Sequence, residues 1–263
     1  MSPFDLTAGD PASPVVLHVP HASRELPPAA RASLLIDDAA LADELDHLTD
    51  AHTDLIAASA ARLAAVRPWI LRHRWSRLAV DPERFPDERE EMRAVGMGAV
   101  YTHGYAGRKL RDEDSVRDGT ALRTHFGPYA AAVRDLVAAR LAATGRAVVL
   151  DVHSYPARPL PYELHGTGPR PPVCLGTDPF HTPAALIAAG SAAFGEVALN
   201  TPFAGCYVPL EFYRREPAVA ALMIEIRRDG YMTEPGGPPT DGLPVLAARL
   251  AALVDTATLR PVE

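Results

Sequence analysis

Short apolar runs that end in polar side chains are the main pattern along the chain. The clearest run is 147–150, which is followed by Asp151, His153 and Ser154 and then by a proline. Apolar residues at helical spacing over 129–141 precede it, and a glycine separates the two segments. Such a run predicts a strand buried on both faces, and open α/β sheets bind ligands beyond the carboxyl ends of these strands. The three polar residues are therefore candidates for a functional site, although a turn with a surface histidine would give the same local sequence.

A second run near the N-terminus has the same form. Residues 15–19 predict an apolar strand that ends at a proline, and His21 stands directly beyond it. A loop histidine on the surface is the ordinary explanation for this position. The alternative is that His21 and His153 meet at one edge of the sheet.

A third run carries a charge inside an apolar strand. Residues 220–226 predict this strand, and Glu225 is its only charged residue. Burying a carboxylate costs on the order of several kcal/mol unless it is paired or bound to a metal. Glu225 is therefore either the ionic partner of Arg227 or Arg228 or a functional group.

An acidic stretch interrupts the first long helical pattern. Residues 37–66 have helical spacing, but carboxylates and histidines are crowded between 43 and 54, with Thr49 able to cap or interrupt a helix. We expect a break near Thr49 and a second helix that starts around Asp50. The acidic residues form either a solvated helix face or a source of a metal-binding carboxylate.

The remaining pattern predicts an α/β protein. Strands are expected around position 70 and over 78–80, 173–178, 197–201 and 206–212, and helices over 182–194 and 243–259. Residues 85–127 have weak periodicity and predict functional loops, in which His103 could line a pocket. No repeat or linker divides the chain, so we expect a flexible N-terminal arm at 1–13 and one catalytic domain at 14–263.

Composition narrows the classes of function. The 263 residues include 48% apolar and 22% charged residues, as in ordinary globular proteins, and the net charge of -7 argues against a nucleic-acid binder. No stretch is long and apolar enough to predict a membrane span, and the N-terminal residues do not resemble a secretory signal, so we expect a cytoplasmic protein. Cys174 and Cys206 are far apart, which disfavours a disulfide framework or a thiolate zinc site.

Histidine and carboxylate residues could instead form a catalytic zinc site. Such a site uses three protein ligands and leaves one position for water. His21, His153 and an acid from 43–54 would meet this need, and Glu225 is available as the separate proton-transfer group.

Arginines are concentrated in one segment of this acidic chain. Arg72, Arg74, Arg77 and Arg84 stand within thirteen positions. The guanidinium group offers a planar fork that matches a carboxylate, which favours an anionic small-molecule substrate. The alternative is an edge strand whose charges prevent aggregation.

Several short motifs, taken in order, resemble the N-formylglutamate amidohydrolase family. They are Val19-Pro-His-Ala-Ser23, Thr49-Asp50-Ala-His52, Ser76-Arg77-Leu-Ala-Val-Asp81 with Arg84, Tyr101-Thr-His-Gly, Asp151-Val-His-Ser154, Leu175-Gly-Thr177, and Ile224-Glu-Ile226 followed by Tyr231-Met232. The resemblance runs across most of the chain. It implies a single-domain α/β fold like that of zinc carboxypeptidases, with a mixed, mostly parallel sheet flanked by helices.

The resemblance also implies roles for individual residues. His21, Asp50 and His153 would hold zinc, Glu225 would be the general base and acid, and Arg77 and Arg84 would bind substrate carboxylates. Glu25 is a rival to Asp50, because it lies in the same loop as His21. Further candidates for substrate binding are Arg74, Ser154, Tyr207 and His103.

Two departures from the family pattern concern the substrate and not the metal. An arginine expected near Leu210 is absent, and Glu83 precedes Arg84 where the family has an asparagine. We expect a zinc amidohydrolase that acts on N-formylglutamate or a related N-acyl amino acid. The alternatives are a carboxypeptidase-like enzyme or deacylase acting on another carboxylated amide, and a ligand-binding protein that kept the fold without catalysis. The oligomeric state is left open.

Overall fold

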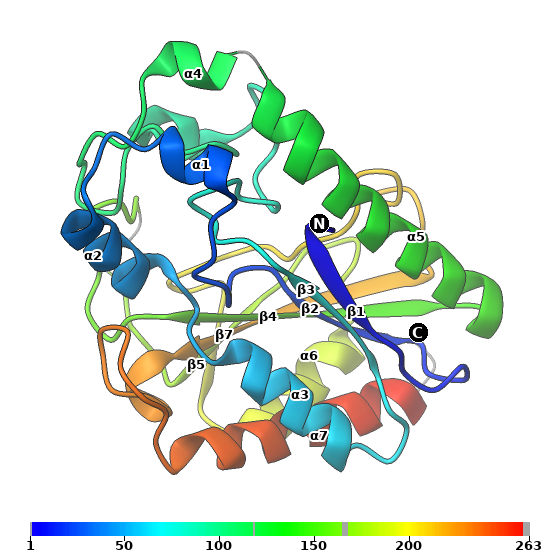
Figure 1. The fold of residues 1–263 in the computed structure, drawn as a ribbon. Helices are drawn as coiled ribbons and strands as arrows, with labels where there is room; N and C mark the ends of the chain where they lie inside the picture. The colour runs from blue at the N-terminus through cyan, green and yellow to red at the C-terminus, as the bar shows by residue number, and fades with distance from the viewer. Residues whose placement is uncertain (1, 118, 165–167, 260–263) are drawn as a thin grey trace.

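A seven-stranded mixed sheet forms the centre of the computed structural model, which describes residues 2–117, 119–164 and 168–259 (Figure 1). The strands are β1 (Phe4–Thr7), β2 (Val15–Val19), β3 (Trp69–His73), β4 (Ala147–Tyr155), β5 (Val173–Gly176), β6 (Val197–Leu199) and β7 (Val219–Arg227). Their order is β1-β3-β2-β4-β7-β5-β6. Only the β1–β3 and β5–β7 pairs are antiparallel. The predicted single-domain α/β fold with a mostly parallel sheet is confirmed.

Helices cover both faces of this sheet. They are α1 (Pro28–Ala32), α2 (Asp38–Leu48), α3 (Thr53–Leu63), α4 (Glu113–Arg117), α5 (Gly127–Thr144), α6 (Ala184–Phe194) and α7 (Gly242–Leu259), with short turns at Glu91–Val95, Leu122–Phe126 and Arg228–Gly230. Helix α5 lies over one face, whereas α3, α6 and α7 lie on the other (Figure 1).

Strand β4 shows how the two faces differ. Val148 and Leu150 belong to the core shared with α3, α6 and α7, whereas Val149 packs against α5. Because alternate residues of a strand point to opposite faces, Asp151 and His153 share the face of Val149. The polar residues therefore lie on the α5 side of the sheet, beyond the apolar contacts with that helix.

Helix α7 is long and apolar enough to cross a membrane if length and composition alone are considered. One side of the helix nevertheless lies in the core, since Leu250, Leu253 and Val254 are fully buried and the helix packs against α3 and α6. The apolar residues on that side are therefore explained by burial inside the domain.

The predicted break in the helical pattern of residues 37–66 is confirmed. Helix α2 ends at Leu48 and α3 begins at Thr53. His52, just before α3, has a left-handed backbone with φ 67°. The break turns the chain so that Asp50 faces the end of β2, where its backbone N–H donates to the His21 carbonyl at 3.0 Å.

Three predictions about strands were wrong. Residues 78–80 form a turn, and they are apolar because Leu78 packs with α2 and the following loops in a separate core cluster. Residues 206–212 have no strand, since Val208 packs against the α5 side of the sheet from a loop. Phe4–Thr7 was assigned to a loose arm but pairs with β3 as an antiparallel edge strand, held by Asp5, which forms ion pairs with two β3-side arginines.

Candidate active site

Two histidines from neighbouring parallel strands meet at the centre of the site. His21 lies in the loop after β2, and His153 lies near the carboxyl end of β4. Their Nδ1 atoms are 3.3 Å apart, and each residue is only 4% exposed. The sheet therefore brings together the two histidines that the sequence analysis singled out.

Asp50 completes a group of three possible ligands. Its Oδ2 is 3.1 Å from His153 Nδ1 and 3.7 Å from His21 Nδ1. Glu25, the rival carboxylate, is exposed in the loop after His21 and does not line the cavity at the site. Of the two predicted acids, only Asp50 reaches both imidazoles.

The other nitrogen of each imidazole faces a second carboxylate. His21 Nε2 is hydrogen-bonded to Asp81 Oδ1 at 2.9 Å, and His153 Nε2 lies 3.0 Å from Asp151 Oδ1. Tyr101 Oη donates to Asp81 Oδ2 at 2.6 Å and fixes that carboxylate. In metal sites, carboxylates behind the histidine ligands set the ring orientation and raise the basicity of the ligand.

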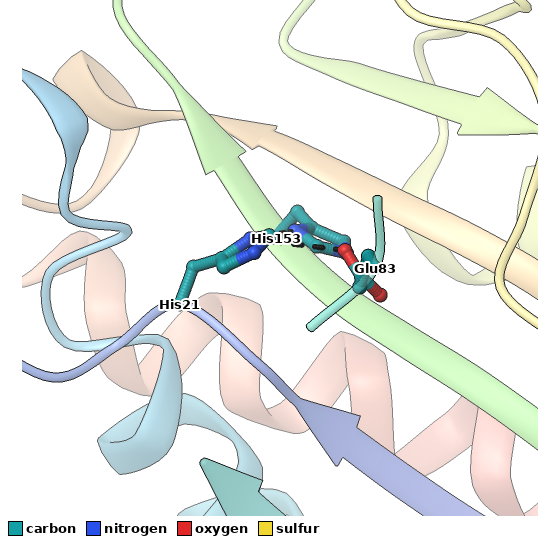
Figure 2. Close-up of side chains that lie close together, drawn as sticks. All are labelled: His21, Glu83 and His153. Carbon is teal, nitrogen blue, oxygen red and sulfur yellow. Dashed lines mark hydrogen bonds and ion pairs between the residues drawn. The ribbon is translucent and has the colours of Figure 1, made fainter. Parts of the chain in front are cut away.

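Glu83 is a further carboxylate in contact with both histidines, and Figure 2 shows it beside His153. One oxygen is 3.1 Å from His153 Nε2 and 3.7 Å from His21 Nδ1, and the other is 3.3 Å from His18 Nδ1. His21, Glu83 and His153 could hold a metal ion, because one ligand atom from each lies within 4.8 Å of the others. In the sequence, Glu83 stands out only as a departure from the family pattern.

Glu225 lies beside His153 in a buried position. The two residues are paired in register across β7 and β4, and Glu225 is 9% exposed. Its Oε2 has no hydrogen-bond partner in the described part of the chain. Burial raises the pKa of Glu225 to about 8, even though His153 and Arg228 lower it.

The alternative of a structural ion pair for Glu225 is not supported by the arginine contacts. Arg227 pairs with Asp229 at 2.8 Å. Arg228 donates to Asp50 Oδ1 at 3.0 Å and to Ser154 Oγ at 3.1 Å. Within the described residues, neither arginine forms an ion pair with Glu225.

Three arginines line a cavity of about 360 Å³ next to the histidines: Arg77, Arg84 and Arg228. Arg77 and Arg228 lie 3.5 and 3.0 Å from the two Asp50 oxygens. Burial would raise the pKa of Asp50, but Arg77, the histidines and Arg228 hold it well below its usual range. The carboxylate is therefore charged and available as a ligand.

Of the other predicted substrate-binding residues, some lie at the active site and others lie outside its cavity. Ser154 lines the cavity, and Tyr207 stacks on His18 at 4.6 Å between ring centroids, next to Asp151. Arg74 instead forms an ion pair with Asp5 on the β1 side of the sheet and does not line the cavity. His103 bonds to neighbouring Thr102 and also lies outside it.

The donor set fits a divalent cation. Buried imidazoles stand among several carboxylates, and His153 Nε2 and Glu225 Oε2 are buried without a hydrogen bond in the described chain. Desolvation would lower the pKa of His153, but Asp151 and Glu83 raise it well above its usual value. This excess of negative charge around two imidazoles is the environment in which a metal cation can replace protons.

Sequence reasoning missed some residues that complete this site. They are His18, Asp81, Glu83 and Arg228, of which Asp81 was named only as a motif member, whereas Asp151 was already a candidate. Strand alternation could have identified His18, because it is the polar residue of an apolar strand and pairs in register with Asp151. No local signal marks Glu83, because the turn after Asp81 places it.

The comparisons with known proteins concern the family and the fold. A model of the family described as N-formylglutamate amidohydrolase matches residues 13–232. A crystal structure of N-formylglutamate amidohydrolase from Ralstonia eutropha has a TM-score of 0.79 at 22% identity, covering 98% of this chain and 98% of that chain. A gene product from Agrobacterium tumefaciens has a TM-score of 0.67 at 18% identity, covering 98% and 95% respectively. No curated protein matches.

The fold and the family model together define an amidohydrolase. More particularly, the chain belongs to the N-formylglutamate amidohydrolase family. The resemblance drawn from the short motifs is confirmed.

Proposed function

We propose that the protein is a zinc-dependent amidohydrolase that cleaves N-formylglutamate or a related N-acyl amino acid. The observation that carries this proposal is the convergence of His21, Asp50 and His153 beside a buried carboxyl, Glu225, that has an oxygen without a hydrogen bond in the described structure. Membership of the family supports an amide as the bond that is cleaved.

His21 Nδ1, Asp50 Oδ2 and His153 Nδ1 would hold the zinc ion, since these atoms lie 3.1–3.7 Å from one another. Asp81 would keep the His21 ring oriented through its hydrogen bond to Nε2, and Asp151, 3.0 Å from His153 Nε2, would stabilise the second ring through its charge. A bound zinc ion would polarise the amide carbonyl and lower the pKa of water.

Glu83 is the competing ligand. It reaches His153 through Nε2 at 3.1 Å, whereas Asp50 reaches the Nδ1 atoms that the two histidines turn toward each other. We therefore favour Asp50. Glu83 would border the site and limit what can lie against His153.

Glu225 would transfer the proton. As a carboxylate it accepts a proton from the attacking water, and as a carboxylic acid it returns that proton to the amine that leaves when the C–N bond breaks. Its raised pKa favours the acid form after the first transfer, and a nearby cation would lower that pKa enough for it to act as a base.

Arg77, Arg84 and Arg228 would bind the carboxylates of the amino acid. They line the cavity, and Arg84 is held in place by Asp81, whose Oδ2 lies 3.5 Å from its Nε. A substrate carboxylate in the cavity would pair with these guanidinium groups and hold the amide against Glu225.

The test is turnover by zinc-loaded protein of N-formylglutamate, N-acetylglutamate and a glutamyl dipeptide. We expect release of glutamate from at least one N-acyl substrate, loss of activity with a chelator and recovery with zinc. Turnover that persists after complete removal of metal would contradict zinc dependence. Failure to cleave any carboxylated amide would contradict the amidohydrolase activity.

A further inference from the structure

A second cavity, of about 720 Å³, adjoins the cavity of the active site. It is twice as large as the first, whose volume of about 360 Å³ is in the range of a small ligand site. The two share lining residues, which are Glu83, Arg84, Glu91, Ala204 and Met223. They are therefore neighbouring parts of one recessed surface.

Strand register places the second cavity directly beside the reacting groups. In the β4–β7 pair, His153 is opposite Glu225, and the preceding pair on the same face is Asp151 with Met223, both of which line the second cavity. Two residues along a strand advance about 7 Å. An amide held between His153 and Glu225 would thus lie within a few carbon atoms of this space.

The second cavity has mixed walls, in which apolar side chains stand beside charged ones. The apolar ones include Phe85, Phe126, Ala130, Val208 and Leu210, and Leu210 is 44% exposed. A formyl group has a single carbon and cannot reach such walls. A longer hydrocarbon chain would bury them, and apolar burial is favourable in proportion to the area removed from water.

Charged side chains of both signs line both cavities, so the position of the arginines relative to the reacting groups sets the orientation. Arg77 and Arg228 line only the active-site cavity, whereas the second cavity contains a carboxylate, Asp151, and two arginines, Arg89 and Arg134. A substrate carboxylate held by the arginines of the active-site cavity would leave the acyl group to extend into the second cavity.

We propose that this second cavity binds the acyl chain, so that the substrates are N-acyl amino acids whose acyl group has several carbons. The inference rests on the proposed amidohydrolase function and assigns its substrate class. Met223, an unbranched and flexible side chain that lines both cavities, forms the adaptable boundary between them.

The test compares N-formylglutamate with N-hexanoylglutamate in wild-type protein, in Ala130→Phe and in Ala138→Phe. Ala130 lines only the second cavity, whereas Ala138 is an exposed position on the same helix and serves as the matched control. We expect wild-type kcat/KM to be at least as high for the hexanoyl substrate. Ala130→Phe should lower it by roughly tenfold or more for the hexanoyl substrate and by less than about twofold for the formyl substrate, since filling space excludes only the longer chain. Ala138→Phe should change neither value.

Retained turnover of the formyl substrate shows that Ala130→Phe is folded, and Ala131→Val repeats the test with a smaller change if it is not. Equal losses for both substrates in the Ala130 variant, or a wild-type preference for formyl, would overturn the acyl cavity while leaving the amidohydrolase function intact. If neither substrate is hydrolysed, the proposed function fails. In that case, calorimetry of N-hexanoylglutamate binding to wild type and Ala130→Phe tests the acyl cavity without turnover. We expect weaker binding to Ala130→Phe, and equal affinities would refute the acyl cavity.

Discussion

The two halves of strands β4 and β7 are built from different residues for different purposes. Their first halves, 147–150 and 219–222, are apolar and at most 1% exposed, between helices on both faces. Their second halves place Asp151, His153 and Glu225 on one face in positions that are almost as deeply buried. Burying such groups costs free energy, so we expect them to serve the proposed function and not stability.

The largest effect on activity is expected from a substitution in the second half of β7. Glu225→Gln keeps the shape of the side chain but cannot accept a proton, so turnover should fall roughly 10²- to 10⁴-fold. Zinc content and thermal unfolding should be close to wild type, because Glu225 is not a proposed ligand. Near-normal turnover would remove Glu225 from the mechanism.

A substitution in the first half of β7 is expected to lower stability without changing the zinc content. Leu222 is fully buried in the core beneath α3, α6 and α7, so Leu222→Ala should lower the free energy of unfolding by roughly 2–5 kcal/mol. Zinc bound per folded chain should not change. Leu63→Ala, at a 60% exposed position, is the control and should have little effect in denaturant titrations. Equal losses in both variants would mean that the first half has no special share in stability.

The comparison also explains how much could be predicted from the sequence. The apolar first halves, like residues 15–19, are continuous apolar runs. These runs predicted the buried strands, the α/β class and the positions of His21, His153 and Glu225. The apolar residues at 78–80 and 206–212 were mistaken for strands because burial by a loop leaves the same pattern. Arg74 was expected in the site but lies outside it, whereas Glu83 was not expected there but contacts His153. Spacing alone does not say toward which side a turn points a charged side chain.

A smaller effect on kcat/KM is expected from arginine substitutions, and it should differ between Arg77 and Arg74. Arg77 lines the site, whereas Arg74 is paired with Asp5 outside it. Arg77→Lys should lower kcat/KM for a carboxylated substrate about ten- to a hundredfold, because a lysine cannot reproduce the planar fork. Arg74→Lys should leave this value within about twofold. Steady-state kinetics that show equal effects would place substrate recognition elsewhere.

A further expected effect is on the pH dependence of unfolding in metal-free protein. The pKa of Glu225, about 8, lies above its usual value of 4.5, so the folded chain retains a proton that the unfolded chain releases. The resulting stability is complete below the unfolded pKa and is lost as pH rises toward 8, by about 1 kcal/mol per pH unit. Urea titrations with a chelator should show this decline in wild type relative to Glu225→Gln. A difference that stays constant between about pH 5 and 8 would contradict the raised pKa.

Metal analysis of the purified protein tests the central claim most directly. We expect about one zinc per chain in wild type, near-complete loss in His21→Ala and His153→Ala, and full retention in His103→Ala, whose side chain lies outside the cavity. Asp50→Asn should lose zinc and Glu25→Gln should keep it. Full zinc occupancy in both the His21 and His153 variants would contradict the proposed site.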